Sequence, residues 1–239
     1  MIRKNILLSI PMLLLLAVII SCSQSGNGEY DSRAIQKLDD LVETIGNLES
    51  CSFTLDVRKT QADSSKAMDT MYVEHDIYLR GPNKMYIYSK HADHNMAYWY
   101  DGDSLSYFSF TKSKYKSYKA ADNILATIDA IHENYGIEFP AADFFYPTLT
   151  DDIIANYDHV LYLGEVEHED ETYVHIEASN EQEILSLWIS SATHLPGQMR
   201  IENGTKGYYE GRFSNWRLDP ELNDEMFLFT PPPGSEKAQ

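Results

Sequence analysis

The 239-residue sequence contains few cysteines, glycines, prolines and basic residues. Its two cysteines cannot form a disulfide-dense scaffold. With 12 glycines, 9 prolines, 43% hydrophobic and 23% charged residues, the composition excludes a collagen-like repeat and a wholly disordered chain. The 19 Lys and Arg residues are outnumbered by 37 Asp and Glu residues, which gives a net charge of −18. Such an acidic chain repels phosphate backbones, so we expect no nucleic-acid partner.

The sequence also lacks the common catalytic and cofactor-binding motifs. It has no G-x-S-x-G, no P-loop, no Rossmann glycine pattern and no C-x-x-C. His132-Glu133 and His168-Glu169 each begin like a zinc-binding helix, but no second histidine follows four residues after the first. His91 and His94 are the best metal candidates, yet no third ligand is evident and a solvated polar loop is preferred. We therefore expect no enzyme activity, metal or cofactor.

The one long apolar run lies at the N-terminus. Arg3 and Lys4 precede the uncharged segment 6–20, which is shorter than the roughly 20 residues of a transmembrane helix and has the length of a signal-peptide core. The run ends in Ile19-Ile20-Ser21-Cys22, which resembles the bacterial lipobox. That resemblance implies that Cys22 carries acyl chains and becomes the mature N-terminus, whereas an ordinary secretory signal is the alternative.

These signals define three regions and a location. We expect a lipoprotein signal peptide at 1–21, a lipidated N-terminus and flexible tether at 22–30, and a single domain at 31–239. No aspartate follows Cys22, so we expect an outer-membrane lipid anchor facing the periplasm; in a Gram-positive host it would be the outer face of the single membrane. With Cys22 acylated, Cys51 has no disulfide partner, and a buried thiol is preferred.

In the mature chain, the spacing of apolar residues predicts a helix, then strands, then a helical insertion and finally more strands. Spacings of three and four predict a first helix from Ala34 to Leu48, capped by Asp31 or Ser32. A central insertion has a helix from Asn123 to Gly136 and a second short helix between Pro140 and Pro147. Alternation predicts about 10 to 11 strands before and after this insertion, at 51–58, 71–79, 85–88, 98–100, 105–110, 160–166, 172–178, 184–190, 198–202, 208–216 and 227–229. This order favours an α+β fold with an antiparallel sheet or barrel.

Several strands are apolar on both faces, which a one-sided antiparallel sheet does not require. One face would be covered by the helices, and the second would line a cavity or form an aromatic outer surface. The candidate cavity-lining residues are Tyr72, Tyr86, Tyr88, Trp99, Ile128, Phe144, Phe145 and Trp188. A core and sheet surface filled with aromatic side chains is the competing interpretation.

Three segments carry a resemblance to a known family. They are "LATIDAIHENYGIEFPAADFFY" (125–146), "LPGQMRI" (195–201), and "FSNWRLDP" with "FLFTPPPGSEK" towards the C-terminus. The chain resembles a family of predicted periplasmic proteins of unknown function (domain of unknown function 2092), from about residue 34 to about residue 237. That family is similar to the lipoprotein-carrier superfamily of LolA, LolB and mycobacterial glycolipid-binding lipoproteins. The resemblance implies a half-open antiparallel β-barrel whose N-terminal helix and central insertion act as plug or lid, with acyl chains held in the cavity.

We therefore expect a membrane-anchored envelope lipoprotein that binds or transfers a hydrophobic ligand, either a lipid or the acyl chains of a lipoprotein. The alternative is a structural lipoprotein with a filled barrel that docks an envelope partner protein. An enzyme acting on envelope lipids or glycans would need a clustered nucleophile or acid–base pair, which the sequence does not locate.

Overall fold

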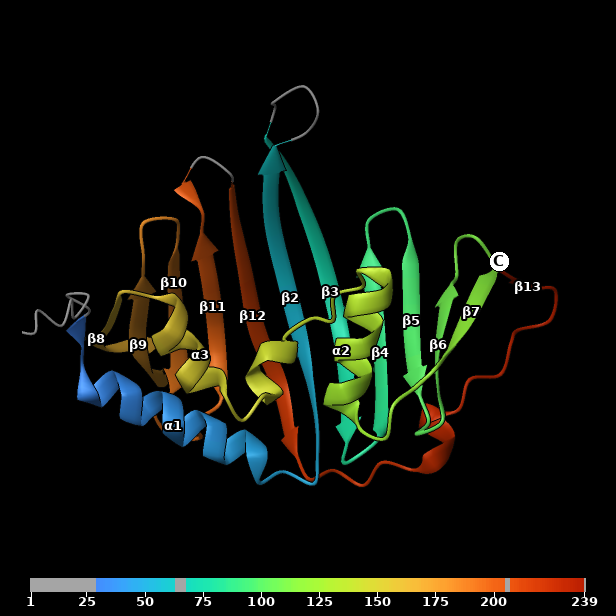
Figure 1. Cartoon of the computed structure of the whole chain (residues 1–239), viewed down its shortest axis with the longest axis horizontal. Helices are drawn as coiled ribbons and strands as arrows, with labels where there is room; N and C mark the ends of the chain where they lie inside the picture. The colour runs from blue at the N-terminus through green and yellow to red at the C-terminus, as the bar shows by residue number, and fades with distance from the viewer. Residues whose placement is uncertain (1–28, 63–67, 205–206, 239) are drawn as a thin grey trace, which may run out of the picture.

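The computed structural model in Figure 1 describes residues 29–62, 68–204 and 207–238. The predicted signal peptide, Cys22 and tether residues 23–28 lie outside the described residues. The last two residues of the expected tether, Glu29–Tyr30, form a short strand, β1. Within the described ranges, every helix is too short or too polar to cross a bilayer.

The strands form a single sheet, in the order β1-β8-β9-β10-β11-β12-β2-β3-β4-β5-β6-β7-β13. Their bounds are β2 Ser50–Ala62, β3 Met68–Arg80, β4 Lys84–His91, β5 Asn95–Tyr100, β6 Ser104–Ser109, β7 Lys114–Lys119, β8 His159–His168, β9 Glu171–Ser179, β10 Ile184–Ser190, β11 Pro196–Glu202, β12 Gly207–Leu218 and β13 Glu236–Lys237. Strands β2 to β12 pair antiparallel, whereas β1 joins β8, and β13 joins β7, in parallel.

The sheet is curled and open (Figure 1), since β1 and β13 are its two edges and do not pair with each other. The expected antiparallel sheet is confirmed, and closure into a barrel is not observed among the described strands. The predicted strand pattern missed β7 and the two edge strands. Tyr115 and Tyr118 of the lysine-rich β7 are three residues apart and give no alternation, and β1 and β13 have only two residues each. Strand β2 lies at the centre of the sheet, where its long antiparallel ladders join the two halves.

We call the face of the sheet that packs against the helices the inner face. Alternate residues of the two central strands, such as Phe53 and Leu55 of β2 and Ile77 of β3, are fully buried there. Cys51 belongs to the same row and is 2% exposed, as expected for a buried thiol. Because side chains alternate along a strand, the residues between these positions lie on the opposite, outer face.

Local capping explains where the two longer helices begin and where α2 ends. Helix α1, Ser32–Gly46, starts where the Asp31 carboxylate accepts a hydrogen bond from the backbone N–H of Arg33 at 2.9 Å. Its apolar stripe of Ala34, Leu38, Leu41 and Ile45 is buried. Helix α2, Ile124–Tyr135, is capped by Asn123 and ends at Gly136, which takes a left-handed φ of 65°.

The central insertion lies across the inner face, with α1 along the lower edge of the sheet (Figure 1). After α2 the predicted second helix is reduced to one 3₁₀ turn, η1, Ala142–Phe145. A third helix, α3, Leu149–Asn156, follows Pro147 and was not predicted. The helix is too short to show a clear amphipathic pattern in the sequence. Its apolar residues Leu149 and Ile153 are buried by packing against the rest of the domain.

The C-terminal segment crosses the outer face instead of adding the predicted strand at 227–229. Asn223 caps a 3₁₀ turn, η3, Asp224–Phe227, by accepting a hydrogen bond from the N–H of Met226. Phe229 then packs against Trp99 at 5.0 Å and Tyr115 at 5.5 Å between ring centroids. This contact, rather than strand pairing, explains the apolar residues of the segment.

Candidate functional site

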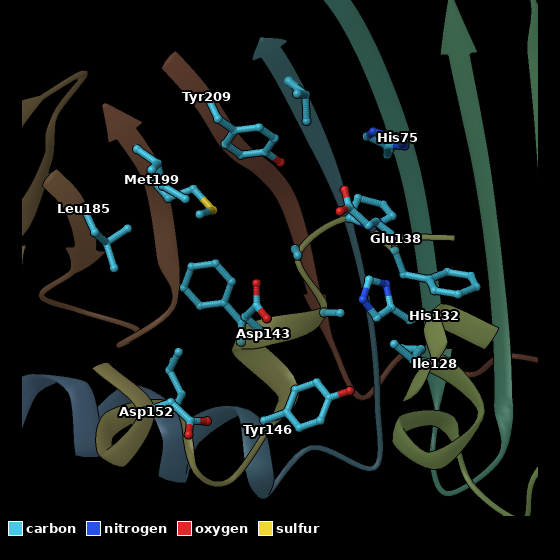
Figure 2. Close-up of a pocket in the computed structure, with 18 of the residues that line it drawn as sticks. His75, Ile128, His132, Glu138, Asp143, Tyr146, Asp152, Leu185, Met199 and Tyr209 are labelled. Atoms are coloured by element: carbon cyan, nitrogen blue, oxygen red, sulfur yellow. The ribbon is translucent and has the colours of Figure 1, made fainter. Parts of the chain in front are cut away.

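A cavity of about 900 Å³ lies between the inner face of the sheet and the chain from α2 to α3. Its volume is at the upper end of the range of roughly 300 to 1,000 Å³ for small-molecule sites. The sheet contributes residues from β2, β3, β4, β10, β11 and β12, on both sides of the central strand. Figure 2 shows Leu185, Met199 and Tyr209 on the strands and Asp143 on η1, around the same space.

The strand wall of the cavity is mainly aliphatic. Alternation along each strand directs every second side chain to this wall, so residues far apart in sequence meet. The apolar lining of the strands consists of Val57, Val73, Leu185, Leu187, Met199 and Ile201. The helical side adds Ile128, Phe139, Phe144, Leu149 and Ile153.

The polar lining is concentrated on the helical side, where four carboxylates are exposed to the cavity. Asp129 accepts a hydrogen bond from the Tyr146 hydroxyl at 2.5 Å, and Asp152 accepts one from the Thr148 hydroxyl at 2.7 Å. Glu138 and Asp143 form no ion pair with a Lys or Arg of the described residues. Partial burial, followed by the charges of Asp152 and Glu138 nearby, raises the pKa of Asp143 above its ordinary value.

The phenol of Tyr209 belongs to the same electrostatic environment. Burial, followed by the charges of Asp143 and Glu138, raises the pKa of Tyr209 to about 12. The hydroxyl therefore stays protonated at neutral pH and can donate a hydrogen bond into the cavity.

Two histidines of the strand side, His75 and His91, also line the cavity. The Nδ1 atom of His75 lies 2.8 Å from the Ser89 hydroxyl, and burial lowers the pKa of His75 to about 4. His91 lies against His94 with ring centroids 3.9 Å apart, and its buried Nδ1 atom has no hydrogen-bond partner in the described part of the chain. Among the described residues, no three His, Cys, Asp or Glu side chains are grouped closely enough to hold a metal ion.

The structure separates the predicted lining residues into two groups. Ile128 and Phe144 line the large cavity, and Phe145 lines a smaller adjacent pocket together with Ile128. The other five lie on the outer face, away from both pockets: Tyr72, Tyr86, Tyr88, Trp99 and Trp188. Tyr86 packs on Tyr78 and Trp99, Tyr88 on Phe110, and Trp188 on His175, whereas Tyr72 is 61% exposed.

The alternation of side chains along each strand explains which predicted residues face the cavity and which lie on the outer face. In β3, Tyr72 shares its face with Glu74 and Asp76, whereas Val73 and Ile77 share the other face. A face that carries carboxylates beside tyrosines is the solvent-facing one, and this signal was present in the sequence. The alternate, aliphatic positions of the same strands were therefore the better candidates for the cavity wall.

A known family matches most of this chain. Residues 34–239 match the family described as "Predicted periplasmic protein (DUF2092)", and no curated protein matches the chain. An uncharacterized conserved protein from Thermus thermophilus has a similar structure, with a TM-score of 0.51 at 8% identity over 86% of this chain and 98% of that one.

Two further solved structures are similar at lower scores. LprF from Mycobacterium bovis has a TM-score of 0.48 at 11% identity, over 87% of this chain and 100% of its own. A LolA superfamily protein from Nitrosomonas europaea has a TM-score of 0.37 at 13% identity, over 82% of this chain and 97% of its own. The family match, which covers most of the sequence, confirms the expected resemblance: the chain belongs to the family of predicted periplasmic proteins (DUF2092).

Proposed function

We propose that this protein is a membrane-anchored envelope lipoprotein that binds or transfers a hydrophobic ligand, a lipid or the acyl chains of a lipoprotein, without converting it chemically. The aliphatic wall of the large cavity is the observation that supports this proposal. Apolar surface facing water is unfavourable by roughly 25 cal/mol per Å², so a ligand that covers this wall gains affinity.

The expected sequence signals agree with the same role. A lipid anchor at Cys22 would hold the domain at the outer membrane, and the family description places its relatives in the periplasm. In this proposal the insertion from α2 to α3 acts as the lid, since it forms the whole side of the cavity opposite the strands.

Binding of N-phenyl-1-naphthylamine, an uncharged fluorescent probe, to the mature chain tests the proposal. We expect saturable binding that envelope lipids displace, and native mass spectrometry should then show a bound mass that organic extraction removes. Ile201→Trp places a larger side chain in the cavity, so its affinity for the probe should fall at least about tenfold. Ile184→Trp is the matched control, because Ile184 is an exposed residue of β10 outside the cavity.

Absence of probe binding to the wild-type chain, with no bound mass after incubation with envelope lipids, would contradict the proposal. It would favour the alternative, a lipoprotein that docks a partner protein. Equal losses in the Ile201→Trp and Ile184→Trp variants would show that the effect of Ile201→Trp is not specific to the cavity, against the proposal.

A further inference from the structure

The charge of the large cavity is unevenly distributed. All four of its carboxylates come from the insertion: Asp129 of α2, Glu138, Asp143 of η1 and Asp152 of α3. The strand side has one formal positive charge, Lys59 of β2, and two histidines, His75 and His91. His132 of α2 is the remaining titratable imidazole of the lining. At neutral pH the lining is therefore net negative, and the negative charge lies on the side of the helices.

Two of these carboxylates are available to a ligand. Asp129 and Asp152 already accept hydrogen bonds from Tyr146 and Thr148. Glu138 and Asp143 accept none from another side chain of the described residues and have no basic partner there. Figure 2 shows both carboxylates directed into the space between the strands and the insertion. Their common influence on Tyr209 and the raised pKa of Asp143 agree with mutual proximity.

Negative charges that have no basic partner, placed beside an apolar wall, determine which head-group charge of a bound amphiphile is favoured. A cationic head near two carboxylates lowers their repulsion, whereas an anionic head adds to it, and the surrounding protein strengthens both effects relative to bulk water. The aliphatic strand wall has no comparable charge preference, because it contributes contact area only.

We propose that the cavity selects amphiphiles with a cationic, amine-type head, whose apolar chain lies on the strand wall and whose head lies between Glu138 and Asp143. This inference rests on the proposed binding function and specifies the ligand class for the same site. Amphiphiles with carboxylate, sulfate or phosphate heads are disfavoured.

Competition against N-phenyl-1-naphthylamine tests this selectivity on the mature chain. The competitors are decyltrimethylammonium, decyl glucoside and decyl sulfate, which share one chain length and are used below their micelle concentrations. We expect decyltrimethylammonium to displace the probe at a concentration at least about tenfold lower than decyl sulfate, since one charge pair at about 4 Å contributes a severalfold change even in water. Decyl glucoside should lie between them.

The double variant Glu138→Gln/Asp143→Asn should bring the three competitors within about twofold of one another while probe binding persists. The matched control, Glu165→Gln/Glu181→Gln, removes two charges from exposed residues outside the cavity and should keep the wild-type ranking. Probe binding with equal displacement by all three competitors would overturn the charge selectivity and leave the binding function intact. Absence of probe binding would overturn the binding function and, with it, this inference. Loss of the ranking in the control variant would assign the effect to overall charge, against the proposal.

Discussion

At the scale of single residues, His75 is held in an environment that opposes its charge. Its ring is half-buried on the inner face and bonded to Ser89, and burial lowers its pKa from 6.5 to about 4. The folded state therefore binds this proton less tightly than the unfolded state does. The stability that depends on neutral His75 is present above pH 6.5 and is lost as the pH falls towards 4.

The variant His75→Asn tests this linkage, since the asparagine amide can still pair with the Ser89 hydroxyl. The wild-type protein should lose about 2 to 3 kcal/mol more unfolding free energy between pH 7 and pH 4 than the variant does. Urea titrations at both pH values measure the difference. His168→Asn, at an exposed position of β8, is the control and should behave as the wild type. An unchanged pH dependence in His75→Asn would contradict the assignment.

At the scale of elements, the C-terminal segment acts as a strap over the outer face. Phe227 is completely buried, with the Arg80 guanidinium over its ring at 5.3 Å, and Phe229 enters the aromatic cluster of Trp99, Phe108 and Tyr115. Strand β13 then joins the edge of the sheet at β7. The strap thus covers aromatic surface that the helices, on the inner face, cannot reach.

Phe229→Ala should lower the free energy of unfolding by about 2 kcal/mol, because it removes a partly buried ring and its aromatic contacts. Leu228→Ala is the neighbouring control, since Leu228 is 53% exposed, and should change stability by less than about 0.5 kcal/mol. Urea unfolding followed by tryptophan fluorescence provides the comparison. Similar effects of the two substitutions would show that the strap contributes little through Phe229.

At the scale of the whole molecule, the central strand of the sheet carries a buried cysteine, Cys51. Cys51 lies in β2, and burial, together with the charge of Asp219, raises the pKa of its thiol to about 12. Because the thiolate is the reactive species, the folded protein keeps this cysteine unreactive at ordinary pH. Reaching it requires separation of the inner face from the helices rather than movement of one edge.

Alkylation of Cys51 by iodoacetamide at pH 8 should therefore be negligible in the native protein and should follow the global unfolding curve in urea. Peptide mass spectrometry reads the Cys51 site separately from Cys22. Trypsin cleavage within the β13 segment, measured in parallel, should begin at lower urea concentrations, since edge elements open first. Rapid alkylation of Cys51 without urea would show that the inner face opens locally.

The sequence alone determined the features that depend on neighbours a few positions away. The caps of α1 and α2 at Asp31, Asn123 and Gly136 follow from short-range hydrogen bonds, and the turn at Asp101 follows from its carboxylate, which accepts bonds from the next N–H groups. Strict alternation in β3 and β4 indicated strands for the same reason. The family resemblance, from segments spread along the chain, implied a half-open antiparallel barrel, of which the antiparallel sheet is observed.

In β4, unlike β3, only the tertiary structure decided which face the helices cover. Tyr86 and Ile87 are adjacent in β4, and both faces of this strand carry apolar side chains. The helices cover the face of Ile87, whereas the C-terminal strap approaches the face of Tyr86. Helix α3 also depends on long-range packing, because its sequence has no long periodic signal of its own. Periodicity specifies that a strand has two faces, and contact with distant segments specifies what each face meets.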